Sequence, residues 1–216
     1  IAVSSLRAGT STITVTVTDG GGLTAHASFL YTRTSLENEF AVGSDRGTSS
    51  SVSLRNADNS VRFTLQPFGT NFTGGIRTAS GDVTGDGVAD LIVASGFGMK
   101  GTVKVFDGVT QAQIPLPESV AGGGTPFGDT FTRGIIVAAG DLNADGLSDL
   151  IITAEAGGGA RVRIFTSTGS GFVQRSDFIS LIDDLGVTDN VRFRGGSRAA
   201  ASDINGDGVN DLVWAA

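Results

Sequence analysis

One nine-residue pattern occurs three times in the chain and constrains its fold more than any other feature. The copies share aspartate at positions one, five and nine and glycine at position six, and they occupy Asp82–Asp90, Asp141–Asp149 and Asp203–Asp211. Their starts are separated by 59 and then 62 residues. Self-similarity at a nearly fixed period indicates a repeat architecture in which each repeat is one supersecondary unit.

The similarity extends beyond the loops without gaps. A glycine stands seven residues before each first aspartate, a phenylalanine stands ten residues before it, and a leucine follows each last aspartate. Further on, the first two copies carry segments of alternating polarity, Val103–Phe106 and Val162–Phe165. Alternation predicts a strand with one buried face. The recurring residues are Phe72, Phe131, Phe193, Gly75, Gly134, Gly196, Leu91, Leu150 and Leu212.

The repeat is predicted to hold four antiparallel strands in roughly 60 residues, which is the composition of a β-propeller blade. The 33 glycines lie between short runs rich in valine, isoleucine and threonine, which favours an all-β fold. The alternative is an ordinary β-sandwich with accidental similarity. Segments 51–54 and 61–65 resemble the later strands of an earlier copy without its loop. Because a propeller closes with about four to eight blades, we expect the native chain to continue or partner chains to complete the ring.

Residues 1–33 do not follow the repeat. Two alternating segments flank an Asp-Gly turn at Asp19 and Gly20, which predicts a β-hairpin. The segment resembles the last two strands of immunoglobulin-like modules in bacterial surface proteins, and the alternative is a hairpin that packs on the propeller edge. The predicted organisation is therefore an immunoglobulin-like end at 1–33, a linker at 34–39, and partial propeller blades, about three repeats, at 40–216.

The loops have the composition of calcium sites. Calcium takes six to eight oxygen ligands, and alternate residues of a tightly curled loop can point to one centre. Magnesium retains several waters, and zinc usually recruits cysteine or histidine, whereas this chain has no cysteine and one histidine, His26, far from every loop. The alternative is a set of solvated Asp-Gly turns. The expected ligands, for about one Ca²⁺ per loop and three in this chain, are Asp82, Thr84, Asp86, Val88, Asp90, Asp141, Asn143, Asp145, Leu147, Asp149, Asp203, Asn205, Asp207, Val209 and Asp211.

Residue twelve separates these loops from EF-hands, which place a glutamate there. Val93, Ile152 and Trp214 occupy that position, so each loop is expected to close at its ninth residue and continue as a strand. Within the set we expect the first loop to bind calcium most weakly, because Thr84 replaces an asparagine at position three.

The Asp-x-Asn-Gly-Asp-Gly-x-x-Asp-Leu pattern with a following glycine-rich turn resembles the FG-GAP repeat of integrin α-chain propellers, in a bacterial branch. The resemblance covers residues 40–216. It implies that each loop links the first two strands of a blade and holds calcium on one rim.

Net charge and the lack of catalytic motifs limit the classes of function that this protein can have. A formal net charge of −7 argues against nucleic acid or an anionic membrane as partner. The sequence has no nucleophile elbow, zinc-protease motif or phosphate loop.

We expect a non-catalytic, extracellular adhesion or scaffold module of a bacterial surface protein, with a protein or glycan partner at the cell surface and possible self-association. The alternatives are a carbohydrate-binding propeller, for which Tyr31 and Trp214 are the candidate platforms, and an accessory domain of a secreted hydrolase or lyase.

Overall fold

The computed structural model describes residues 9–18, 20–33, 39–117, 126–127, 130–175 and 195–215, and every regular element in these ranges is a β-strand. Over the same ranges, no helix is long and apolar enough to cross a membrane. The strands are β1 (Gly9–Thr18), β2 (Thr24–Arg33), β3 (Phe40–Gly43), β4 (Val52–Arg55), β5 (Val61–Leu65), β6 (Ile76–Gly81), β7 (Asp90–Ser95), β8 (Val103–Phe106), β9 (Gln113–Ile114), β10 (Ile135–Gly140), β11 (Asp149–Ala154), β12 (Val162–Ser167), β13 (Phe172–Gln174), β14 (Arg198–Ser202) and β15 (Asp211–Ala215).

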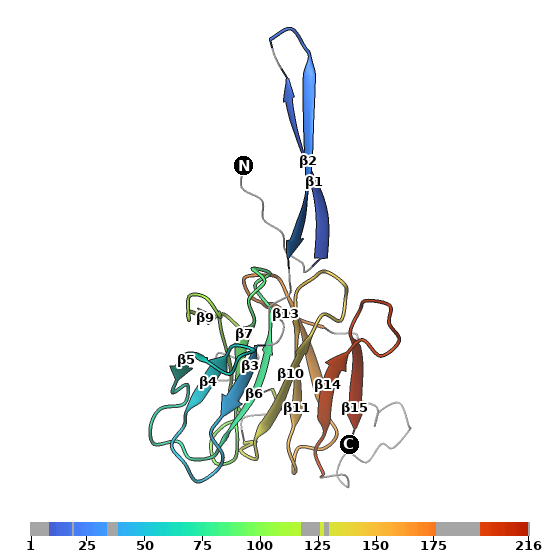
Figure 1. The fold of residues 1–216 in the computed structure, drawn as a ribbon. Coiled ribbons are helices and arrows are strands. Elements are labelled where there is room, and N and C mark those ends of the chain that lie inside the picture. Colours follow the sequence, from blue (N-terminus) through green and yellow to red (C-terminus); the bar gives the residue numbers. More distant parts are fainter. Residues whose placement is uncertain are drawn as a thin grey trace.

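The strands form several small antiparallel sheets in chain order. Two sheets have four strands, β6-β7-β8-β9 and β10-β11-β12-β13, and they are flanked by the three-stranded β3-β4-β5 and the two-stranded β14-β15. Strands β3, β6, β10 and β14 lie next to one another in that order, so the sheets stand side by side like blades (Figure 1). The predicted all-β fold of four-stranded antiparallel blades, present here as a partial propeller, is confirmed.

The three-stranded sheet has the register of strands two to four of a blade. Glu39 precedes Val52 by the same number of residues by which Asp90 precedes Val103. The turn after β3 also repeats the turn after β7: the Ser44 amide donates to the Ser51 carbonyl at 2.8 Å, and the Ser95 amide donates to the Thr102 carbonyl at 2.9 Å. The earlier copy predicted from 51–65 therefore includes β3 as well.

The hydrophobic core lies between blades, and strand β7 shows why. All six residues of β7 are buried, as are those of β11, because each of these strands has a neighbouring blade on both faces. Leu91 and Val93 pack with the β3-β4-β5 sheet, whereas Ile92 and Ala94 pack with the next blade. Side chains on a strand alternate between faces, so one strand joins three blades.

The N-terminal residues form the predicted hairpin. Strands β1 and β2 pair from Gly9↔Arg33 to Thr18↔Thr24 and form a sheet of their own. The hairpin extends away from the blades (Figure 1), and the described side chains of its second strand are exposed. Residues 1–8 and 34–38 lie outside the described residues, as does Phe193.

The inter-blade core predicts a contrast between two valines of one blade. Val105 on β8 is fully buried between blades, whereas Val109 in the following turn is 54% exposed. We expect Val105→Ala to lower the free energy of unfolding by about 1.5–3 kcal/mol, because it removes buried apolar surface. Val109→Ala is the matched control, and its loss should stay within about 0.5 kcal/mol. Urea unfolding measures both, and equal losses would contradict an inter-blade core.

Candidate metal centre

The three aspartate loops occupy equivalent places on one rim. Each loop links the first two strands present in its blade, β6 to β7, β10 to β11 and β14 to β15, and all three lie at the upper end of the blades in Figure 1. The residue before each loop pairs with the ninth loop residue: Gly81↔Asp90, Gly140↔Asp149 and Ser202↔Asp211. Each ninth aspartate begins a strand, which confirms that the loops close there and differ from EF-hands.

The first aspartate of each loop organises the turn around its own carboxylate. Asp82 Oδ1 accepts a hydrogen bond from the Gly85 amide at 2.6 Å, and Oδ2 accepts one from the Gly87 amide at 2.7 Å. Asp203 repeats both contacts with Gly206 and Gly208. Gly87 has φ of 83°, and its equivalents have 88° and 89°, a conformation that side chains with Cβ rarely adopt. Glycine at position six is therefore required by the backbone.

The ninth aspartate holds the loop to the rest of the blade. Asp90 is fully buried, and its Oδ2 accepts from the amides of Val83 and Thr84 at 2.8 and 3.0 Å. Its Oδ1 accepts from the Gly108 amide, in the turn after β8, at 2.8 Å. Asp149 makes the corresponding contacts with Leu142 and Ser167. One carboxylate at the start of the second strand thus joins the aspartate loop to the end of the third strand or to the turn after it.

Burial changes the acidity of these carboxyl groups. Desolvation raises the pKa of Asp90 to about 7, although three backbone hydrogen bonds oppose the shift, and the nearby Asp82 carboxylate adds to it. The pKa of Asp149 is raised to about 6, again chiefly by burial. The pKa of Asp82 is also raised by burial. Negative charge on Asp82, Asp90 and Asp149 is therefore costly in these loops.

Positions three, five and seven lie at the exposed end of the loop. Asn143 donates from Nδ2 to Asp145 Oδ2 at 2.9 Å, and Asn205 repeats this contact with Asp207. The carboxylate at position five accepts from the amide of position seven at 2.8 Å in all three loops. The residues whose carbonyls were predicted as ligands, Val88, Leu147 and Val209, are the donors of these bonds.

The donor chemistry fits a hard cation, but the side chains are turned toward the loop amides. Within the described ranges, no group of three or more His, Cys, Asp or Glu side chains converges closely enough to hold a metal ion. An ionised carboxylate offers about four lone-pair sites, so an amide contact leaves capacity for a cation. In each blade the predicted ligand residues thus lie in one loop, but the side chains described here do not converge on one point as they would around a bound ion.

Adjacent loops are joined by hydrogen bonds through position eight. The Ser148 amide of the second loop donates to the Asp82 carbonyl of the first at 2.7 Å. The Asn210 amide of the third loop donates to the Asp141 carbonyl of the second at 2.9 Å, and Asn210 Oδ1 accepts from the Asp141 amide at 2.9 Å. Position one of each earlier loop is therefore fixed in part by the next blade.

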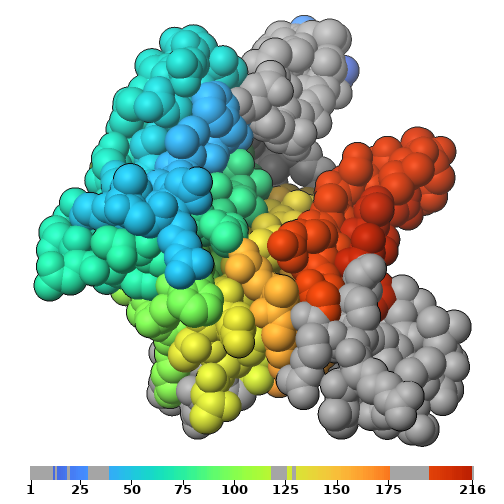
Figure 2. Space-filling view, turned by 90° about the horizontal axis from the view of Figure 1, so that it is seen from below, coloured from blue at the N-terminus to red at the C-terminus, as the bar shows by residue number. Residues whose placement is uncertain are grey.

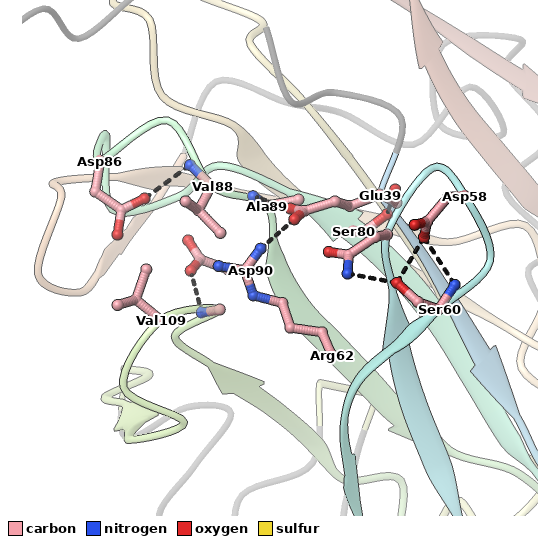
Figure 3. Close-up of polar contacts among 12 residues, drawn as sticks. Glu39, Asp58, Ser60, Arg62, Ser80, Asp86, Val88, Ala89, Asp90 and Val109 are labelled. Carbon is pink, nitrogen blue, oxygen red and sulfur yellow. Dashed lines mark hydrogen bonds and ion pairs between the residues drawn. The ribbon is translucent and has the colours of Figure 1, made fainter.

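A buried glutamate takes over this role where no earlier loop exists. Glu39 Oε2 accepts from the Ala89 amide, at position eight of the first loop, at 2.8 Å. Its Oε1 pairs with Arg62 of β5, and its carbonyl accepts from the Ser80 hydroxyl at 3.0 Å (Figure 3). The Glu39 residue is 7% exposed.

The sequence interpretation assigned Glu39 to a linker and gave it no role. The signal that could have found it is its spacing to Val52, which places it where the other blades have their ninth aspartate.

Comparison with known proteins agrees with this geometry. Residues 74–108 and 133–174 match the family model of the FG-GAP repeat. The two segments contain the first and second aspartate loops together with the strands that flank them. No curated protein matched the chain. The two matches support a β-propeller-type family, as the sequence resemblance implied, and they cover less than half of the chain.

The Glu39 contacts predict that substitutions of Glu39 destabilise the protein, and that the loss is smaller when the new side chain keeps a hydrogen-bond acceptor. Glu39→Ala removes the partner of the Ala89 amide and of Arg62, and a buried donor left unpaired costs about 1–3 kcal/mol. Glu39→Gln keeps an oxygen acceptor and loses only the charge, so we expect a smaller loss in free energy of unfolding. Chemical denaturation of the two variants measures the difference. Wild-type stability of Glu39→Ala would show that the contact is not needed.

The raised pKa values of Asp90 and Asp149 predict a pH dependence of the stability of the calcium-free protein. Asp90 and Asp149 have a pKa near 3.8 when unfolded and about 7 and about 6 when folded. Between about pH 4 and 7 the folded state therefore binds more protons than the unfolded state, so its stability falls as pH rises through this window. Urea unfolding after removal of calcium should show this slope, and Asp90→Asn should reduce it. A stability that rises from pH 4 to 7 in both proteins would contradict the prediction.

Proposed function

We propose that the chain is a calcium-stabilised, non-catalytic adhesion or scaffold module of an extracellular bacterial surface protein. The observation that carries the proposal is the threefold recurrence, on one rim, of a loop that brings oxygen donors from positions one, three, five and nine to the same turn. FG-GAP repeats are typical of extracellular proteins, where calcium is abundant enough to fill loops of modest affinity. The hairpin at 9–33 serves in this proposal as the end of an immunoglobulin-like module that precedes the blades.

Calcium would act here by relieving charge repulsion. Each loop has three carboxylates, and two of those in the first loop have a pKa raised by burial. A bound cation would favour the ionised form of these groups. Because the ion binds the folded loop and not the unfolded chain, it would stabilise the protein by about 2.7 kcal/mol per site at a free concentration one hundred times the dissociation constant.

Two other functions have less support. A carbohydrate-binding propeller needs an exposed aromatic platform, but the Trp214 indole is partly buried and its Nε1 lies in a site without a hydrogen-bond partner among the described residues. The side chain of Tyr31 lies outside the part of the chain that the structure describes. A role as accessory domain of a secreted hydrolase or lyase has no specific observation in its favour.

The position-five aspartates provide the test of calcium binding. Asp86, Asp145 and Asp207 are exposed or lie at the exposed end of their loops, so the triple Asp→Asn variant should fold while it loses three ligand charges. We expect calcium to raise the melting temperature of the wild type and to have little effect on the triple variant. Asp58→Asn, an exposed aspartate of the β4-β5 turn, is the control. Equal calcium-induced shifts in wild type and triple variant would refute the assignment, as would no shift in the wild type.

A further inference from the structure

The rim opposite the aspartate loops carries a surface of different chemistry. It is formed by the β3-β4 turn, the β7-β8 turn and the segment before β10, which lie side by side in blue, green and yellow in Figure 2. Backbone hydrogen bonds join them, in part through the segment before β6. The Gly47 amide donates to the Thr73 carbonyl at 2.8 Å, and the Gly96 amide donates to the Gly75 carbonyl and the Gly98 amide to the Thr132 carbonyl, both at 2.9 Å. A Cβ placed on Gly74 would lie 1.9 Å from the Phe97 carbonyl oxygen, so the backbones are in close contact and the surface is well fixed.

Two arginines stack on one phenylalanine at this rim. The Cζ atom of Arg46 lies 4.4 Å from the ring centroid of Phe97, and that of Arg133 lies 5.9 Å from it. Phe97 is 39% exposed, and both arginines are exposed. Among the described residues, neither guanidinium forms an ion pair. We call this set, Arg46, Phe97 and Arg133, the arginine stack.

The surroundings leave this surface with excess positive charge. Arg77 of β6 lies beside the stack, and its Nε pairs with Glu155 Oε1 at 2.7 Å. The other acid of this rim, Asp45, accepts from the backbone amide of Arg46 at 2.7 Å. Among the described residues of this surface, three arginines thus meet two carboxylates, on a chain whose net charge is −7. The local charge is opposite to that of the whole protein, and complementary charge is what steers an anionic partner to a surface.

Stacking prepares the guanidinium groups to bind carboxylates. A guanidinium held against an aromatic ring keeps its N–H donors at its edge, where they can form two parallel hydrogen bonds with one carboxylate. Holding the side chain in place also lowers the entropy that binding costs. Because Arg46 lies over the ring of Phe97, that ring is not a free platform for a sugar. Two arginines without an ion-pair partner in the described part of the chain are also too few for a long polyanion, whose binding requires many phosphate-type contacts.

We propose that the arginine stack binds an acidic peptide segment of a partner protein, with carboxylates of the segment paired to Arg46 and Arg133, whose guanidinium groups the Phe97 ring holds in place. The inference deepens the partner-binding part of the proposed function and does not depend on calcium. It assigns the partner surface to the rim that bears no aspartate loops.

The test uses the whole chain in calcium-containing buffer. An array of synthetic peptides with one to four Asp or Glu residues, each beside its Asn or Gln counterpart, is screened, and the binding peptides are titrated by fluorescence anisotropy. We expect acidic peptides to bind, their amide counterparts to bind at least tenfold more weakly, and added salt to weaken the binding. The double variant Arg46→Gln, Arg133→Gln should lose at least tenfold in affinity. Arg55→Gln, at the other end of the β3-β4-β5 sheet, is the matched control and should bind as the wild type does.

Each remaining outcome decides against the proposal or separates it from the calcium assignment. Wild-type affinity in the double variant, no binding of any acidic peptide by the folded chain, or binding of a heparin fragment but of no acidic peptide would each overturn it. The calcium-induced melting shift is recorded on the same samples. Peptide binding without any calcium shift would refute the calcium sites and leave the arginine stack supported, whereas a calcium shift without peptide binding would do the reverse.

Discussion

The contact on which the blades depend is the hydrogen bonding of the ninth aspartate to backbone amides. Asp90 and Asp149 lie where an amide of the loop and an amide at or just after the end of the third strand would otherwise be buried without acceptors. A short carboxylate can reach both because the loop closes at Asp90 itself, which pairs with Gly81, the residue before the loop. The inter-blade core can then use every residue of the second strand, since the polar backbone at its start is already satisfied.

This arrangement places the chemistry and the packing in separate regions of each blade. The carboxylates lie at one end of the strands, the apolar residues occupy the middle, and arginines and glycines gather at the opposite end. The two rims consequently differ in charge although they belong to the same strands. A negatively charged rim suits cations, and a rim with exposed arginines suits carboxylates.

The blades could be predicted from the sequence because the repeat fixes both their length and the place of their loops. The pattern of aspartates and glycines located all three loops, and the leucine after each loop located the second strand. The sequence interpretation missed Glu39 because its contact is with Ala89 in the next blade, and only the spacing of Glu39 to Val52 relates it to the ninth aspartates. Phe97 and its arginines escaped for the same reason. How far the oxygen donors converge could not be predicted either, because residue spacing does not say whether a carboxylate turns toward a cation or toward an amide.

The row of position-eight contacts has a consequence for how such a chain can change in length. A residue inserted into one aspartate loop would shift an amide that reaches the previous loop and a carbonyl that receives the next, so two neighbours would be disturbed at once. The spacing between successive loops varies from 59 to 62 residues, but each loop keeps nine residues, so the difference in length lies outside the loops. At Glu39, one carboxylate paired with an arginine provides the first member of the row without a loop. Blades of this kind can therefore be gained or lost as whole units, provided that a side chain such as Glu39 caps the row.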